Sequence, residues 1–260
     1  MSAHPARAAA RQLLTISCGG EYTLRSLFDP WAPDCGELMF IPYTFWAIEH
    51  ERGWVLIDCG PHPDLALSPA LRLGAQAELS DVRVSEQDNV ASRLAGAGVE
   101  LSAVTDVIAT HLHYDHCGGL ELLPKATVHV QRSELDFASK PPIYQDAAYT
   151  PADWASVDRW AVHDGEHDVF ADQAILLVPT PGHTPGHQSV IVRLPDATVI
   201  CVADAAYHPD KMAERKLPGY LWNPDAVIDS WERLERLRAE TGATFVFSHY
   251  PLPRHPQHSV

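Results

Sequence analysis

One run of the sequence, 110–116 (Thr-His-Leu-His-Tyr-Asp-His), limits the fold more than any other feature. The run directly follows 104–109, a short apolar segment with the composition of a buried strand. Imidazole and carboxylate groups are the ligands that borderline cations such as Zn²⁺ take in proteins. Further ligands can reach such a run from the ends of other strands, so the pattern predicts a sheet-based fold whose strand ends converge at one edge.

Three other candidate ligands also come at the ends of predicted strands. His183 follows one such strand, Asp204 closes the next, and His249 comes just after the last. With the histidines and aspartate of the first run, they exceed the four ligands that a structural zinc site requires, and no cysteine is among them. This excess of imidazole and carboxylate favours a two-metal catalytic site with open coordination positions.

The remaining pattern is that of an α+β protein. Short β-rich segments separated by Pro, Gly and Asp predict strands at 37–48, 54–59, 104–109, 126–130, 174–178, 189–194, 198–203 and 244–247. Helices are predicted at 87–97, from Ser133, and from Asn223 to Gly242. We expect one domain over 1–260, with sheet packed on sheet and helices outside. Loop-rich insertions are expected at about 20–37, 61–86 and 138–158, the first and last of them outside the core.

The histidine run resembles a known signature. His111-x-His113-x-Asp115-His116 followed by Gly118-Gly119 resembles that of the metallo-β-lactamase fold, and the three later ligands fall in the order of that family. Within the family, the segment 180–189 (TPGHTPGHQS), the segment 204–207 (DAAY) and the segment 130–134 (VQRSE) resemble the N-acyl-homoserine lactone lactonases. The resemblance implies an αββα sandwich and a metal-dependent hydrolase that opens a lactone ring, the activity known as quorum quenching.

The resemblance also implies how the candidate ligands are divided. One divalent cation would be held by His111, His113 and His183, the other by Asp115, His116 and His249, with Asp204 bridging them. We expect Zn²⁺, with Co²⁺, Fe²⁺ or Mn²⁺ as alternatives. Hydroxide formed at the pair would attack the ester carbonyl. Asp115 would then pass a proton to the leaving ring oxygen, and Tyr207 would donate a hydrogen bond to the developing oxyanion.

Two residues are expected to support the ligands from behind. Asp58 closes the predicted strand 54–59, where an aspartate of this fold accepts a hydrogen bond from the metal-binding loop. His187 lies four positions after His183, and we interpret it as a hydrogen-bonded structural histidine rather than a ligand. No function is expected of the other histidines, which are His4, His50, His62, His129, His163, His167, His208, His255 and His258.

The composition limits which cellular compartment and which binding partners are expected for this chain. The formal charge of −15 disfavours nucleic acid and anionic membrane surfaces, both of which attract Lys and Arg. Five widely spaced cysteines without a C-x-x-C pair are typical of a reducing compartment. The first dozen residues lack the apolar stretch of a signal peptide, and we expect a cytoplasmic protein. Aromatic side chains crowd two segments, where they line a channel for an acyl chain or form a homodimer interface.

Several other functions are alternatives to the hydrolysis of an N-acyl-homoserine lactone. A lactonase for another ring ester is the nearest alternative. A glyoxalase II-like thioesterase normally adds a C-terminal helical domain, for which the eleven residues after His249 leave little room. Zinc β-lactamases usually carry a cysteine or other residue in place of Asp204. Nucleases of the superfamily are disfavoured by the charge, and di-iron oxidoreductases usually have a glutamate in place of His113. A scaffold with a degraded site is disfavoured because every expected ligand is present.

Overall fold

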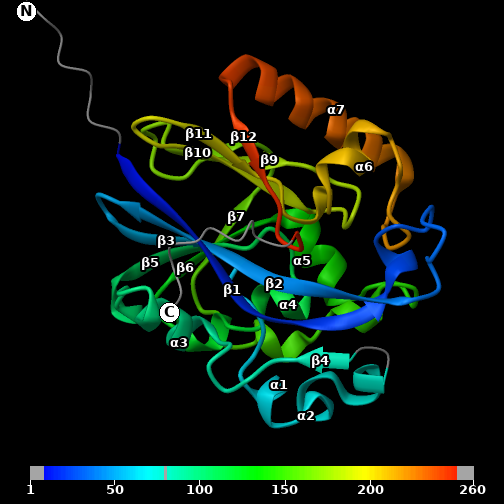
Figure 1. Ribbon diagram of the computed structural model, residues 1–260. Helices are drawn as coiled ribbons and strands as arrows, with labels where there is room; N and C mark the ends of the chain where they lie inside the picture. The colour runs from blue at the N-terminus through cyan, green and yellow to red at the C-terminus, as the bar shows by residue number, and fades with distance from the viewer. Residues whose placement is uncertain (1–8, 79–80, 251–260) are drawn as a thin grey trace, which may run out of the picture.

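The computed structural model describes residues 9–78 and 81–250, which fold around two facing β-sheets (Figure 1). The larger sheet has the strand order β4-β1-β2-β3-β5-β6-β7, and the smaller has the order β12-β11-β10-β9-β8. The strands of the larger sheet are β1 (Ala10–Leu24), β2 (Leu38–His50), β3 (Gly53–Ile57), β4 (Asp81–Arg83), β5 (Val104–Ile108), β6 (Thr127–Gln131) and β7 (Trp160–His163). Those of the smaller sheet are β8 (His167–Asp168), β9 (Ile175–Pro179), β10 (Gln188–Arg193), β11 (Thr198–Cys201) and β12 (Thr244–Val246).

Helices cover the outer face of each sheet. The α-helices are α1 (Asp64–Leu67), α2 (Pro69–Leu73), α3 (Val90–Gly96), α4 (Tyr114–Cys117), α5 (Arg132–Ser139), α6 (Pro209–Ala213) and α7 (Pro224–Thr241). In Figure 1, α7 lies along the smaller sheet, and α3 lies on the opposite side of the molecule beside the larger one. The order of layers is therefore helix, sheet, sheet, helix, which confirms the predicted αββα sandwich.

Three apolar clusters hold these layers together. Leu94 of α3 and Ala138 of α5 pack with buried residues of the larger sheet. Trp46 and Ile175 lie in the cluster between the two sheets. Trp231 of α7 packs against the outer face of the smaller sheet. Burial of such large apolar side chains contributes roughly 2–3 kcal/mol each, so the clusters fix the relative position of the strand ends.

Helix α7 shows how local sequence sets the boundaries of an element. The Asn223 side chain accepts hydrogen bonds from two backbone N–H groups at the start of the helix, and Pro224 occupies the first turn, where a missing N–H has no effect. The buried residues Val227, Trp231 and Leu234 are spaced along one face, as the sequence predicted. Gly242 ends the helix with a φ of 68°, a conformation that glycine adopts without strain.

Two expected loop segments differ from the prediction. Strand β1 runs through 20–24, where a loop was expected, because this part pairs with both β2 and β4. In this part the buried positions are polar (Glu21, Thr23) and the exposed ones apolar (Tyr22, Leu24), the reverse of the alternation by which a strand is predicted. The segment 138–158 was expected outside the core, but Gln145, Tyr149 and Asp153 are buried in it. Each of them makes a hydrogen bond with another part of the chain, which offsets part of the cost of burial. Among the described residues, Oε1 of Gln145 and Oδ2 of Asp153 have no hydrogen-bond partner.

Among the described helices, none combines the length and the apolar character that crossing a bilayer requires.

Candidate metal centre

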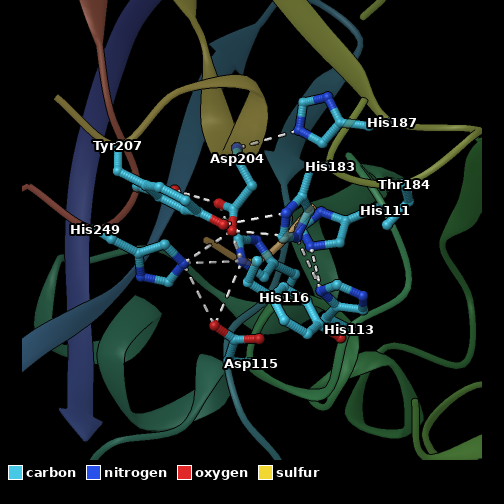
Figure 2. A network of polar contacts seen from close by, with 12 residues as sticks. His111, His113, Asp115, His116, His183, Thr184, His187, Asp204, Tyr207 and His249 are labelled. Carbon is cyan, nitrogen blue, oxygen red and sulfur yellow. Dashed lines mark hydrogen bonds and ion pairs between the residues drawn. The ribbon is translucent and has the colours of Figure 1, made fainter. Parts of the chain in front are cut away.

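All seven predicted ligands meet at one end of the sandwich, where strands of both sheets terminate (Figure 2). His111 and His113 follow β5, and Asp115 and His116 lie in the short helix α4. The other three follow strands of the smaller sheet: His183 comes after β9, Asp204 after β11, and His249 after β12. Six of the seven side chains are buried, and Asp115 is half-buried.

Three imidazoles form the first group. Nδ1 of His113 lies 3.0 Å from Nε2 of His111 and 3.0 Å from Nε2 of His183. A neutral imidazole has a single N–H, so three nitrogens that face one point cannot all be satisfied by hydrogen bonds among themselves. Among the described residues, the other nitrogen of His113 has no hydrogen-bond partner although it is buried. The group is therefore built as a set of ligand nitrogens.

Protonation of this first group is disfavoured. Burial and the neighbouring imidazoles hold the pKa values of His111 and His113 well below the usual range. Burial lowers the pKa of His183 to about 4 against the opposing effect of Asp204. All three rings are then neutral at physiological pH, which is the form of imidazole that binds a metal.

The second group combines two imidazoles with two carboxylates. Nε2 of His116 lies 3.3 Å from Nε2 of His249 and 3.4 Å from Oδ2 of Asp115. Burial alone would lower the pKa of His116, but Asp115, Asp204 and Asp58 outweigh it and raise the pKa well above its usual value. Burial would raise the pKa of Asp115, but the two imidazoles lower it to about 2. This negative site attracts protons in the absence of a metal, and a divalent cation would replace them.

Asp204 faces both groups. Its Oδ2 lies 3.2 Å from Nε2 of His249 and 3.5 Å from Nε2 of His183. The carboxylate also accepts a 2.7 Å hydrogen bond from the hydroxyl of Ser248, while the backbone N–H of Asp204 donates to Nε2 of His187 at 3.1 Å. These contacts orient the side chain between the two groups, as a bridging ligand requires.

The rings are held from behind in one tautomer. Nδ1 of His116 donates to Oδ2 of Asp58 at 2.8 Å, and Nδ1 of His249 donates to the carbonyl of Pro42 at 2.8 Å. The hydroxyl of Thr110 donates to Oδ2 of Asp58, so it accepts from Nδ1 of His111 at 3.0 Å. In each case a proton lies on Nδ1, so Nε2 is the nitrogen that faces the centre and would bind a cation, as in metal sites of known proteins.

The two predicted supporting residues occupy distinct positions. Asp58 has a φ of 60° and accepts from the N–H of Thr110 at 2.8 Å, which places its carboxylate directly behind the ligand loop. His187 is buried and its ring contacts Thr180 and the N–H of Asp204. Nε2 of His187 accepts the hydrogen bond from the backbone N–H of Asp204. This nitrogen therefore faces the backbone and not the two groups of ligands. This geometry agrees with the structural role expected of His187.

Glu134 is a functional residue that the sequence analysis did not single out. Its fully buried carboxylate accepts from the N–H of Leu112 and from the hydroxyl of Tyr149, both at 3.0 Å. It also accepts from the hydroxyl of Thr184 at 2.6 Å. Leu112 lies between two ligands and Thr184 directly follows another, so this one side chain fixes two ligand loops. The segment 130–134 carried a family resemblance, but no pattern identified the glutamate as the anchor.

A cavity of about 250 Å³ opens onto the ligands. Its polar wall includes His113, Asp115, His183, Asp204 and His249. The apolar part of the wall is formed by Leu27, Phe28, Ile41, Leu73, Ala147 and Ala148. Of the aromatic residues considered for a channel in the sequence, Phe28 lines this cavity. The combination of a polar end with an apolar wall is typical of a site for an amphiphilic small molecule.

Tyr207 lies at the polar end of the cavity (Figure 2). Its hydroxyl lies 3.1 Å from Nδ1 of His183. Burial, followed by the charge of Asp204, raises the pKa of Tyr207 well above its usual value, so the phenol keeps its proton. Because Nε2 of His183 faces the ligand group, its Nδ1 carries the proton and donates to Tyr207. The phenolic proton is donated to the carboxylate of Asp204 in this structure.

Comparison with known proteins gives consistent results. Residues 40–249 match the family model of the metallo-beta-lactamase superfamily. The N-acyl homoserine lactonase AttM of Azorhizobium caulinodans is 33% identical, with 81% of this chain and 82% of that protein covered. The N-acyl homoserine lactonase AiiA of Bacillus thuringiensis subsp. kurstaki is 26% identical over 82% of this chain and 83% of that protein.

Solved structures show the same fold. An N-acyl homoserine lactone hydrolase with N-hexanoyl-L-homoserine bound at its catalytic metal centre superposes with a TM-score of 0.82 at 23% identity. That match covers 93% of this chain and 94% of the other. The dizinc lactonase AidC superposes with a TM-score of 0.71 at 17% identity, and the match covers 95% and 92% of the two chains.

Proposed function

This chain belongs to the metallo-beta-lactamase superfamily, and we propose that it hydrolyses the lactone ring of N-acyl-homoserine lactones and so quenches bacterial signalling. The observation that carries the proposal is the convergence of five imidazoles and two carboxylates at the polar end of an apolar cavity. Relatives named N-acyl homoserine lactonase match over four fifths of the chain and support the choice of substrate.

We propose that the two groups hold a pair of divalent cations, with zinc as the metal. His111, His113 and His183 would bind one cation, Asp115, His116 and His249 the other, and Asp204 both. The fixed tautomers of the imidazoles support this assignment, as do the three nitrogens of the first group, which face one point and cannot satisfy one another by hydrogen bonds. Such a pair polarises an ester carbonyl and provides hydroxide at neutral pH.

Asp115 carries the proton in the proposed reaction. Ring opening adds water across the carbonyl carbon and breaks its bond to the ring oxygen, which leaves as an alcohol and therefore needs a proton. Asp115 lines the cavity, and the neighbouring imidazoles keep its pKa at about 2. The ionised carboxylate would bind a cation through one oxygen and, through the other, would take up the proton of the attacking water and return it to the ring oxygen.

Tyr207 stabilises the charge that develops on the carbonyl oxygen. Since its hydroxyl oxygen accepts from Nδ1 of His183, its own proton can be donated into the cavity. A donor fixed in this way before the reaction contributes about 3–4 kcal/mol to the transition state. Phe28 packs edge-on against the Tyr207 ring, with 4.5 Å between centroids, and limits its rotation.

The apolar wall of the cavity would receive the acyl chain. Leu27, Phe28 and Leu73 offer apolar surface there without a polar group on the side chain. Each buried methylene of a ligand contributes about 0.8 kcal/mol, so chain length should affect KM more than kcat.

Location and assembly are proposals that follow from other features. All five cysteines are free thiols, which supports a reducing compartment such as the cytoplasm. Five apolar side chains are exposed near the end of β1 and the start of β2, and this apolar surface supports a homodimer. They are Tyr22, Leu24, Trp31, Leu38 and Phe40.

A panel of substrates tests the proposed function. The zinc-loaded chain is incubated with N-acyl-homoserine lactones of several chain lengths, simple γ-lactones, a β-lactam and a glutathione thioester, and proton release is followed. We expect the highest kcat/KM for the acyl-homoserine lactones. Fast thioester hydrolysis with inert lactones would instead identify the chain as a glyoxalase II-like enzyme.

A further inference from the structure

A second cluster of histidines joins the two sheets at one edge of the sandwich. Strand β7 is the edge strand of the larger sheet, and β8 is the edge strand of the smaller one. His129 comes from β6, His163 from the end of β7, and His167 from the start of β8. One ring nitrogen of each lies within 4.8 Å of the others.

The three rings lie against one another in series, with one contact between ring nitrogens. The rings of His129 and His163 are stacked, with 5.3 Å between centroids, and those of His163 and His167 are stacked at 4.0 Å. Nδ1 of His129 lies 3.0 Å from Nε2 of His163. Burial, followed by the effects of His167 and His129, lowers the pKa of His163 to about 4. At least one ring in the cluster is therefore neutral and has a free lone pair at physiological pH.

A carboxylate fixes the tautomer of the buried member. Nε2 of His129 donates to Oδ1 of Asp106 at 2.9 Å, which leaves the lone pair on Nδ1 facing His163. Burial raises the pKa of Asp106, but the hydrogen bond from His129 outweighs this and lowers it, so Asp106 is a carboxylate. The pair repeats the arrangement of Asp58 and His116 behind the metal centre.

The backbone that carries the cluster is also held in place. The side chain of Gln131 accepts from the N–H of Gly165 at 3.0 Å and donates to its carbonyl at 2.9 Å. Gly165 lies midway between His163 and His167, so both positions are fixed relative to β6. Because stacked rings cannot direct their in-plane lone pairs at one point, the exposed His167 ring would rotate out of the stack to complete a site around one ion.

We propose that His129, His163 and His167 bind a divalent transition-metal cation of the class that prefers imidazole, such as Zn²⁺, Ni²⁺ or Cu²⁺. Three histidine ligands with water in the fourth position form a known type of zinc site. His167 is exposed, so the ion enters from solvent without opening the core. A bound ion would connect the edge strands of the two sheets and stabilise the folded state, because the unfolded chain does not bring the three ligands together.

Metal stoichiometry tests the proposal. The untagged full chain is titrated with Zn²⁺ against a chromophoric chelator, and the bound ions per chain and their affinities are measured. We expect two tightly bound ions and a third, weaker one, and we expect His163→Ala/His167→Ala to lose only the third. His208→Ala, which removes an exposed histidine elsewhere, should keep all three. His4, His255 and His258 remain in every variant, so weak binding by them cancels in the comparison.

Two milder variants keep the test valid if the double variant fails to fold. His167→Gln changes one exposed side chain, and Asp106→Asn keeps the size of the group behind His129. We expect Asp106→Asn to weaken the third site about 10- to 100-fold, the usual effect of losing such a carboxylate. Two ions per chain in the unmodified protein, or a third ion of unchanged affinity in the double variant, would each overturn the proposal.

Discussion

The molecule contains two histidine clusters that share one arrangement, a carboxylate behind an imidazole, but differ in the charged groups that face the rings. In each, a carboxylate behind one imidazole fixes its proton: Asp58 behind His116, and Asp106 behind His129. At the metal centre two further carboxylates face the rings, and they raise the pKa of His116 although burial opposes this. At the edge of the sandwich the rings mainly face one another, and the pKa of His163 falls to about 4.

The difference teaches that facing carboxylates, more than the number of histidines, set how strongly a cluster attracts a cation. The metal centre combines negative charge with burial, where electrostatic attraction is weakly screened. The edge cluster has a single carboxylate behind it and one ring on an exposed residue, where water screens the ion. We therefore expect the first to hold its cations through purification and the second to exchange its ion with the medium.

The largest effect is expected from Asp204→Ala, because Asp204 is the only one of the proposed ligands assigned to both cations. The variant should lose at least about three orders of magnitude in kcat/KM, which corresponds to several kcal/mol of transition-state stabilisation. Metal content and lactone hydrolysis are measured together. Normal turnover with two ions still bound would refute the bridging role.

Tyr207→Phe should lower kcat by about 10²–10³-fold with little change in metal content, since it removes one hydrogen-bond donor and no proposed ligand. Steady-state kinetics on one acyl-homoserine lactone measure the effect. Tyr220→Phe is a matched control, because Tyr220 also lines the cavity and lies beside the ring of His183. An unchanged kcat in Tyr207→Phe would leave Tyr207 with a packing role only.

Glu134→Gln should reduce the stability of the metal centre while leaving the edge cluster unaffected. The substituted amide can accept fewer of the three hydrogen bonds, and a buried donor left unsatisfied costs about 1–3 kcal/mol. Denaturant unfolding should show this loss, and the affinity for the two tightly bound ions should fall with it. Equal stability and affinity in the variant would show that the ligand loops are positioned without Glu134.

Removing the metal ions in two steps distinguishes the ion of the edge cluster from those of the metal centre. A weak chelator should first remove the ion of the edge cluster, with a fall of a few degrees in Tm and no loss of activity. A strong chelator should then remove the pair and abolish hydrolysis. Loss of activity at the first step would show that the exchangeable ion belongs to the metal centre.

The smallest expected effect is a pH dependence in the metal-free chain. Because the pKa of His163 is about 4 in the folded state and about 6.5 when unfolded, the unfolded state binds the proton first as the pH falls. The contribution of His163 to stability is constant above about pH 6.5 and decreases from there toward pH 4. Solvent screening of this partly exposed ring should limit it to under about 1 kcal/mol. The stability difference from His163→Gln across this range measures it, and a flat difference would contradict the lowered pKa.

The strand pattern predicted sheet packed on sheet and pointed to the candidate ligands, because each of them follows a strand, and the family resemblance implied the αββα order and the division of the ligands between two cations. The sequence did not predict the role of residues whose partners are brought together only by the tertiary fold. Glu134 acts on three partners from separate segments, and the edge cluster requires the pairing of β6 with β7 as well as the position of β8. A single sequence contains no local signal for either arrangement.

The last of the proposed ligands also has a consequence for the time course of synthesis. His249 donates to the carbonyl of Pro42 across 207 positions of sequence, so its place at the centre depends on both the early and the late parts of the chain. The first imidazole group is complete once His183 has left the ribosome, whereas the second waits for His249, roughly 3–13 s later at ordinary rates of translation. A nascent chain therefore cannot hold both of the proposed cations, or open a lactone, before His249 has been added.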